Sequence, residues 1–368
     1  MGKVTYLIGA GASANCLPVI KDIKSHWNLF ENFINELNDF SNHIHILLKS
    51  TGSSDVDVLR SAFQDRLSLA EGITLPGGRT WNDYRLEMVK EIKILKEATH
   101  SHHTVDVYAK KLLIRAGLDS LPYKKLKALL SLFFIYLQQS RPVDPRYDSF
   151  FASIIKEGNH YPSNNIRIIS WNYDYQFEKS YASFTNKKTL SDAQSSLCVH
   201  IPKTIEGLSP YAFNIFKLNG TTGFYKDGYL APCLDDLSCT PHENFESYVE
   251  QYAECVYGQA SVQPLLSFSW EREKVWKDNF NELLSYSCKN TDALVIIGYS
   301  FPFFNREVDT NIMNMFTNSK IYIQDLYPQA VRNALTSVMP GPGEKVIYDL
   351  PIVEGSANQF HIPYELTL

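Results

Sequence analysis

Residues 3–13, KVTYLIGAGAS, decide the fold class of this 368-residue chain. A short apolar run ends on Gly9 and Gly11, which lie one residue apart, and Ser13 follows. The apolar run predicts a buried strand of a parallel sheet. Glycines after such a strand let backbone amides approach a diphosphate, because a side chain at either position would block the approach. A plain tight turn is the alternative, and Ser13 is equally suited to bind phosphate or to cap a helix.

Later runs of β-branched and aromatic residues predict the rest of the sheet. Each ends in small or polar residues, and they cover 165–174, 214–220, 292–300, 320–328 and, near the end, 345–350. Helical patterns lie between them, over 270–287 and 306–316. Strands that alternate with helices predict an α/β fold with a Rossmann-like, doubly wound parallel sheet.

The region 22–160 has a different pattern. Its apolar residues recur at three- and four-residue spacing, which is typical of amphipathic helices. We therefore predict one Rossmann-like domain from 1–21 and 161–368. The region 22–160 would be a large helical insertion after the first strand, packed over the ligand crevice as a lid.

The composition excludes several classes of protein. A net charge of −5 gives no indication of a nucleic-acid partner, and no apolar run is long enough to span a membrane. The six cysteines are scattered without a Cys-x-x-Cys pair, so no metal site is expected. The short apolar run at the start does not resemble a signal peptide, and we expect a cytoplasmic protein.

Polar residues follow the second predicted strand at its carboxyl end, where doubly wound sheets bind ligands. Asn172 and Asp174 are two residues apart, so they share one side if the chain stays extended. An amide and a carboxylate there can hold a ribose hydroxyl and steer water toward a sugar carbon. The alternative is an Asx turn that closes the strand.

The other strand ends carry Asn219, then Gly298 with Ser300, then Asp325. A carboxylate at Asp325 can accept hydrogen bonds from both hydroxyls of a ribose, although a solvated loop acid has the same pattern. A dinucleotide dehydrogenase would need an acidic residue about 20 residues after the glycines. That region has a helical pattern instead, so a dehydrogenase is disfavoured.

The order of these motifs resembles the sirtuin-like family, which binds NAD. The resemblance rests on GAGAS (9–13), WNYD (171–174), KLNG (217–220), IIGYS (296–300) and the late acid. The helical insert and the lack of a four-cysteine zinc module resemble the bacterial branch, whose members consume NAD in anti-phage defence. The resemblance implies three groups of NAD-binding residues: Gly9, Ala10, Gly11 and Ser13 at the diphosphate, Asn172 and Asp174 at the nicotinamide ribose, and Gly298, Ser300 and Asp325 at the adenosine.

The chain departs from this family at Asn219, which stands where the family has its catalytic histidine. An asparagine amide cannot exchange a proton near neutral pH, and general-base help is worth about 10²–10⁴-fold in rate. The resemblance implies an NAD glycohydrolase with Asn172, Asp174 and Asn219 at the reaction centre and reduced activity.

Three explanations of Asn219 stay open: a natural variant with reduced or redirected activity, a binding-only sensor or assembly subunit for NAD or ADP-ribose, and an engineered substitution. The resemblance also implies a homo-oligomer and a separate ATPase or sensor protein as partners.

Overall fold

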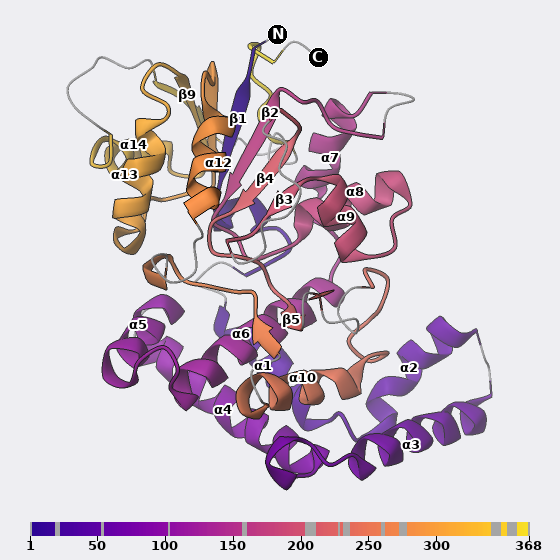
Figure 1. Ribbon diagram of the computed structural model, residues 1–368. Helices are drawn as coiled ribbons and strands as arrows, with labels where there is room; N and C mark the ends of the chain where they lie inside the picture. The colour runs from indigo at the N-terminus through magenta and orange to yellow at the C-terminus, as the bar shows by residue number, and fades with distance from the viewer. Residues whose placement is uncertain are drawn as a thin grey trace. The chain divides into compact units, whose positions relative to one another are not determined.

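The structure is a computed structural model that contains a seven-stranded parallel sheet with helices beside it (Figure 1). It describes residues 2–18, 23–52, 55–101, 104–156, 160–202, 211–226, 229–230, 236–258, 262–271, 278–339, 347–351 and 359–366. The seven-stranded sheet has the order β10-β9-β8-β1-β2-β4-β3. Its strands are β1 (Val4–Ile8), β2 (Ile166–Ser170), β3 (Val199–His200), β4 (Asn214–Lys217), β8 (Ala293–Ile297), β9 (Lys320–Asp325) and β10 (Ile347–Pro351). Every pair of neighbours in it is parallel, so the predicted α/β fold with a parallel sheet is confirmed.

Helices cover both faces of this sheet. Leu7 of β1 belongs to a core cluster with residues of three helices, α12 (Asp278–Cys288), α13 (Arg306–Asn314) and α14 (Pro328–Thr336). Tyr6, the residue before Leu7, points to the opposite face. Its ring contacts Phe150 of α7 (Pro145–Ile154) edge-on, with the ring centroids 5.1 Å apart. Two covered faces are the arrangement of a Rossmann-like sheet.

The strand order places a topological switch point beside β1. From β1 the chain continues to β2 and β4 on one side of the sheet, and later to β8, β9 and β10 on the other. Loops therefore leave the carboxyl ends of β1 and β8 in opposite directions, which is where such sheets bind ligands. The remaining elements around the sheet are η1 (Ala10–Ser13), α8 (Gln176–Thr185), α9 (Leu190–Ser196), η4 (Ser269–Glu271) and η5 (Phe303–Asn305).

The chain divides into two compact units. Unit 1 contains the parallel sheet and comprises 1–17, 142–221 and 266–368, whereas unit 2 comprises 18–141 and 222–265. These bounds differ from the predicted division into 22–160 and the rest. The helix α7 belongs to unit 1, and unit 2 gains the second segment, which the sequence analysis did not assign to it. The predicted boundary at 21–22 lies outside the described residues.

Unit 2 is mostly helical and has an aromatic core. Trp27 of its first helix stacks on Phe133 at 3.9 Å, and Tyr248 packs against the same cluster. The helices are α1 (Ile23–Asn35), α2 (Phe40–Thr51), α3 (Val56–Gly72), η2 (Pro76–Gly78), α4 (Trp81–Ser101), α5 (Val105–Ala116), α6 (Leu121–Gln139) and α10 (Phe245–Tyr257). The unit also holds an antiparallel sheet of β5 (Phe224–Lys226), β6 (Tyr229–Leu230) and β7 (Val262–Pro264), which the sequence analysis did not predict.

The helix predicted over 270–287 is described only in part. Residues 269–271 form the 3-10 helix η4, α12 covers the stretch from Asp278 onward, and 272–277 lie outside the described residues. The strand indicated at 345–350 is confirmed as β10. Within the part of the chain that the structure describes, no helix combines the length and apolar character that crossing a bilayer requires.

Candidate functional site

The glycine turn after β1 lies directly against the end of β8. The Gly9 N–H donates to the Ile297 carbonyl at 2.9 Å, and the Gly11 N–H donates to the Gly298 carbonyl at 3.0 Å. A Cβ on Gly9 would lie 2.5 Å from the Gly298 carbonyl oxygen, and one on Gly298 would lie 2.4 Å from the Ala12 nitrogen. Gly298 also has a φ of +60°, which side-chain-bearing residues rarely adopt. The turn therefore needs glycine for backbone packing.

This contact changes the explanation of the GAGAS motif. The amides of Gly9 and Gly11, expected to face a diphosphate, are already bonded to carbonyls of the β8 end. The tight-turn explanation thus accounts for both glycines. Ala10 is exposed between them, and its contact with a diphosphate stays a prediction.

Ser13 brings the first two strand ends together. Its hydroxyl lies 2.6 Å from the Tyr147 hydroxyl and donates to Asp174 Oδ2 at 2.8 Å. Asn172 Nδ2 donates to the same Ser13 oxygen at 3.3 Å and to the Gly9 carbonyl at 3.1 Å. Asn172 and Asp174 therefore face the same side, as predicted, although β2 has already ended at Ser170.

Asp174 is a buried carboxylate with several partners. The Gln176 N–H donates to its Oδ1 at 3.2 Å, which is the Asx-turn contact that the sequence analysis kept as an alternative. Burial raises the pKa of Asp174, whereas the nearby Lys217 ammonium and the Ser13 hydrogen bond lower it. A carboxyl group with raised pKa at a ligand edge is suited to exchange a proton with substrate or water.

Asn219 lies at the end of β4 with one amide atom unsatisfied. Its Nδ2 is 3.4 Å from the Trp171 carbonyl, and the backbone carbonyl of Asn219 accepts from the Ser267 N–H at 2.8 Å. Among the described residues, neither Asn219 Oδ1 nor Ser267 Oγ has a hydrogen-bond partner, and both are buried. Buried polar atoms without partners are rare in proteins and indicate that a ligand group or water belongs beside them.

The structure places the adenosine-side candidates at the next strand ends. Ser300 is exposed two residues after Gly298, and Asp325 is the half-buried last residue of β9. Asp325 Oδ1 accepts from the Tyr327 N–H at 2.8 Å, as in an Asx turn. These two residues share the carboxyl edge with Ser13 but take no part in its hydrogen-bond network.

Two buried neighbours of this network were missed from the sequence. Asp144 and Arg146 form a bidentate ion pair, and Arg146 Nη1 donates to the Gly11 carbonyl at 3.1 Å. The available signal was Asp144 before a proline, since aspartate followed by proline is a typical start of a helix. Tyr147 follows on the first turn of that helix, where it reaches Ser13.

A second buried acid lies beneath the end of β8. Both oxygens of Asp309 lie 2.8 Å from the Tyr299 hydroxyl, and Asn305 Nδ2 donates to that hydroxyl at 3.0 Å. Burial raises the pKa of Asp309 to about 7, partly offset by Tyr299 and the Trp171 indole. The Tyr299 ring stacks on Trp171 at 5.8 Å and so links the β8 end to the β2 end.

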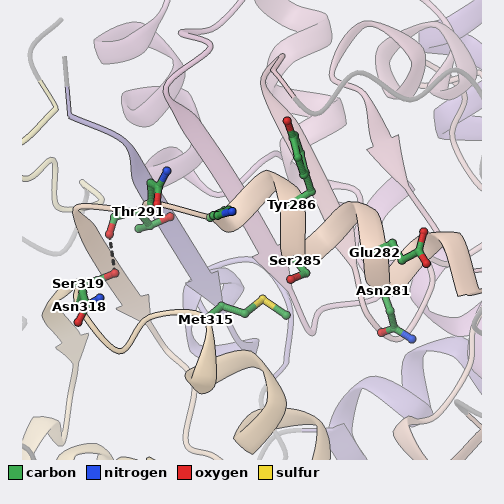
Figure 2. Close-up of a pocket in the computed structure, with 10 residues that line it drawn as sticks. Asn281, Glu282, Ser285, Tyr286, Thr291, Met315, Asn318 and Ser319 are labelled. Atoms are coloured by element: carbon green, nitrogen blue, oxygen red, sulfur yellow. Dashed lines mark hydrogen bonds between the residues drawn. The ribbon is translucent and has the colours of Figure 1, made fainter.

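A pocket of about 770 Å³ lies at the amino ends of β8 and β9, opposite the carboxyl edge that holds the candidate site (Figure 2). Thr291 precedes β8 and Ser319 precedes β9, and the Ser319 hydroxyl donates to the Thr291 carbonyl at 2.6 Å. Four other lining residues come from α12 and are exposed, Glu282 and Tyr286 among them. This pocket is therefore remote from the residues that the motifs single out.

His200 and His361 each contact another residue of unit 1. His200 on β3 is bonded to Asn214, and the His361 ring packs on Tyr322. Over the described part of the chain, no three metal-ligating side chains form a group. Comparisons with protein-family models and with curated proteins give no match for this sequence. The functional argument therefore depends on the geometry of the site.

Proposed function

We propose that this chain binds NAD at the carboxyl edge of its parallel sheet and hydrolyses the bond between nicotinamide and ribose. The observation that carries the proposal is the meeting of Ser13, Asn172 and Asp174 in one buried network beside the switch point. Doubly wound sheets bind nucleotides at that place. The unsatisfied Asn219 oxygen supports a polar ligand group, such as a ribose hydroxyl, at the next strand end.

In the proposed reaction the bond between ribose C1′ and the nicotinamide nitrogen breaks, and its electron pair leaves with neutral nicotinamide. The oxygen of a water molecule then bonds to C1′, and one proton is released. Asp174, as a carboxylate, would stabilise the positive charge on the ribosyl group and accept that proton. Asn172 would orient the water, because its amide plane is fixed by Gly9 and Ser13.

The second candidate function is binding without turnover. Asn219 occupies the position of the family's histidine, and its amide cannot carry a proton. The chain would then sense NAD or ADP-ribose and report it to a partner protein. The observation that favours this candidate is that Asn219 is itself buried and held at the Trp171 carbonyl.

The resemblance to bacterial sirtuin-like proteins extends the proposal to the cell. We propose that the chain is a cytoplasmic effector of anti-phage defence and that its activity depends on self-assembly or on a partner ATPase or sensor. Phage infection of cells that carry the parent chain or an Asp174→Asn chain tests this role. NAD should fall after infection only with the parent.

The decisive experiment compares NAD binding by calorimetry with nicotinamide release by the same samples. The set is the parent chain, Asn219→His, Asp174→Asn and Asn172→Ala. Asn318→Ala is the matched control, because Asn318 is an exposed asparagine of the remote pocket. We expect the parent and the control to bind equally and Asn172→Ala to bind at least ten-fold more weakly.

The outcomes separate the two functions. Asn219→His should release nicotinamide about 10²–10⁴-fold faster than the parent if the site is hydrolytic. Binding by the parent and by Asn219→His, with release by neither, would leave the sensor function. Absence of NAD binding in both would refute the proposal as a whole.

A further inference from the structure

Lys217 is a fully buried cation at the end of β4. Its side chain is 1% exposed, and its Nζ lies 2.6 Å from Glu178 Oε1, which is itself 0% exposed. The same Nζ donates to the backbone carbonyl of Asp174 at 2.5 Å. A charged group removed from water this completely needs a charged partner and further hydrogen bonds.

The ammonium connects three elements of unit 1. It comes from β4, pairs with Glu178 on α8, and holds the carbonyl of the 171–175 segment that follows β2. That segment carries both Asn172 and Asp174. Lys217 therefore fixes the backbone from which the two predicted site residues project.

Lys217 supplies positive charge beside the buried Asp174 carboxylate. The titratable and charged groups that face the Asp174 carboxylate are Tyr147 of α7, Tyr175 beside it, Glu178 of α8 and Lys217 of β4. Lys217 is the cation among them, and it opposes the effect of burial on the pKa of Asp174, whereas Glu178 adds to that effect. One ammonium thus serves two buried carboxylates.

Glu178 has only part of its hydrogen-bonding capacity filled. Gln194 Nε2 donates to Oε1 at 3.2 Å, but Oε2 is buried without a partner among the described residues. Replacing a buried ion pair by apolar residues is often neutral for stability, so stability alone is a weak explanation for a pair that leaves one oxygen unsatisfied. The pair is therefore better explained by its effect on Asp174.

We propose that Lys217 is a positioning residue for the candidate site, which holds the 171–175 segment in place and favours the charged form of the Asp174 carboxylate. This inference rests on the proposed function for the role of Asp174 toward NAD. The contact between Lys217 and Asp174 is independent of that role and is measurable without ligand.

The test removes both charges of the pair together. Lys217→Met alone leaves Glu178 buried and unpaired, which is strongly destabilising. Lys217→Met with Glu178→Gln keeps the volume and removes the orphaned charge. The matched control removes the partly exposed Arg332–Asp349 pair, whose atoms lie 2.8 Å apart, by Arg332→Met with Asp349→Asn. Lys217→Arg restores the charge and serves as the conservative variant.

The first readout needs no ligand. The pH at which Asp174 takes up a proton is obtained from the pH dependence of the melting temperature, relative to the same chain with Asp174→Asn. In the Lys217→Met/Glu178→Gln chain we expect this pH to rise, because Lys217 affects Asp174 more strongly than the opposing Glu178 does, with little change in the control chain and in Lys217→Arg. An unchanged pH in the double variant would overturn the proposal.

The second readout is NAD affinity at two pH values. The double variant should bind NAD about ten-fold more weakly at pH 7 and regain affinity at pH 9, because a higher pH favours the ionised form of Asp174. An equal loss at both pH values would show a structural role only and would overturn the positioning role. Lack of binding by the parent chain would refute the proposed function, whereas the first readout would still decide the role of Lys217.

Discussion

The contact between Gly298 and the turn after β1 makes a sharp prediction for Gly298→Ala. An alanine Cβ would lie 2.4 Å from the Ala12 nitrogen and 2.5 Å from the Gly11 carbonyl carbon, and both are backbone atoms that cannot rotate away. The φ of +60° adds a backbone term that is independent of the clash. The substitution should therefore disturb the packing between the carboxyl ends of β1 and β8, where the candidate site lies.

Gly52→Ala is the matched control for this prediction. Gly52 ends α2 with a φ of +65°, close to that of Gly298, but a Cβ there would meet no atom within 4 Å. The left-handed conformation costs alanine about 1–2 kcal/mol, and overpacking a tight site costs about 1–3 kcal/mol more. We expect a loss of about 1–2 kcal/mol for Gly52→Ala and about 2–5 kcal/mol for Gly298→Ala.

Hydrogen exchange of peptides that cover β1, β8 and α2 measures these losses locally, which avoids assuming that the two units unfold together. Gly298→Ala should speed exchange in β1 and β8 and weaken NAD binding, whereas Gly52→Ala should affect only α2. Equal losses in the two variants would refute the reasoning, because the backbone term alone would then explain both.

Three further predictions concern buried polar groups. Burial lowers the pKa of His43 from 6.5 to about 4, so between these pH values only the unfolded chain takes up the proton. The free energy of unfolding should therefore fall by about 3 kcal/mol as the pH drops from about 6.5 to 4. In urea unfolding, His43→Phe should remove this part of the pH dependence. Asp309 has a pKa raised to about 7, so its effect has the opposite sign: stability falls as pH rises from about 4 to 7, and Asp309→Asn should gain stability at pH 8 relative to pH 4. Ser13→Ala removes the hydroxyl between Asn172 and Asp174 and should lower both melting temperature and NAD affinity, whereas a loss of neither would contradict the network.

The sheet could be predicted from the sequence because its main strands are rich in β-branched and aromatic residues and are followed by small or polar residues. Val4–Ile8 and Ala293–Ile297 both have this form, and both are buried along their whole length. The antiparallel sheet of unit 2 could not be predicted in the same way. Its strands have two or three residues each, too short for any period to show.

The site was predictable in part. Polar residues at strand ends can be found from the sequence, because the carboxyl ends of parallel strands share one edge. Contacts that cross from other elements cannot, and Tyr147, Arg146 and Lys217 enter the network from α7 and β4. For the glycines, the motif could be found from the sequence but its structural cause could not. Their motif was recognised, but the backbone contact with Gly298 that requires them depends on the pairing of β1 with β8.

The position of Asn219 gives the charge of Asp174 a larger role than it would have in a site with a histidine. In a histidine-containing site the imidazole exchanges protons near neutral pH, and a neighbouring carboxylate mainly orients substrate. Here the group in the network of Ser13 and Asn172 that is suited to accept a proton is Asp174, and burial works against its charged form. A buried cation at Lys217 is what such a site needs, because Asn219 can neither share the proton nor compensate the charge. Under the proposed function, Asn219 leaves Asp174 as the proton acceptor, and the buried Lys217 would favour the charged form that this role needs.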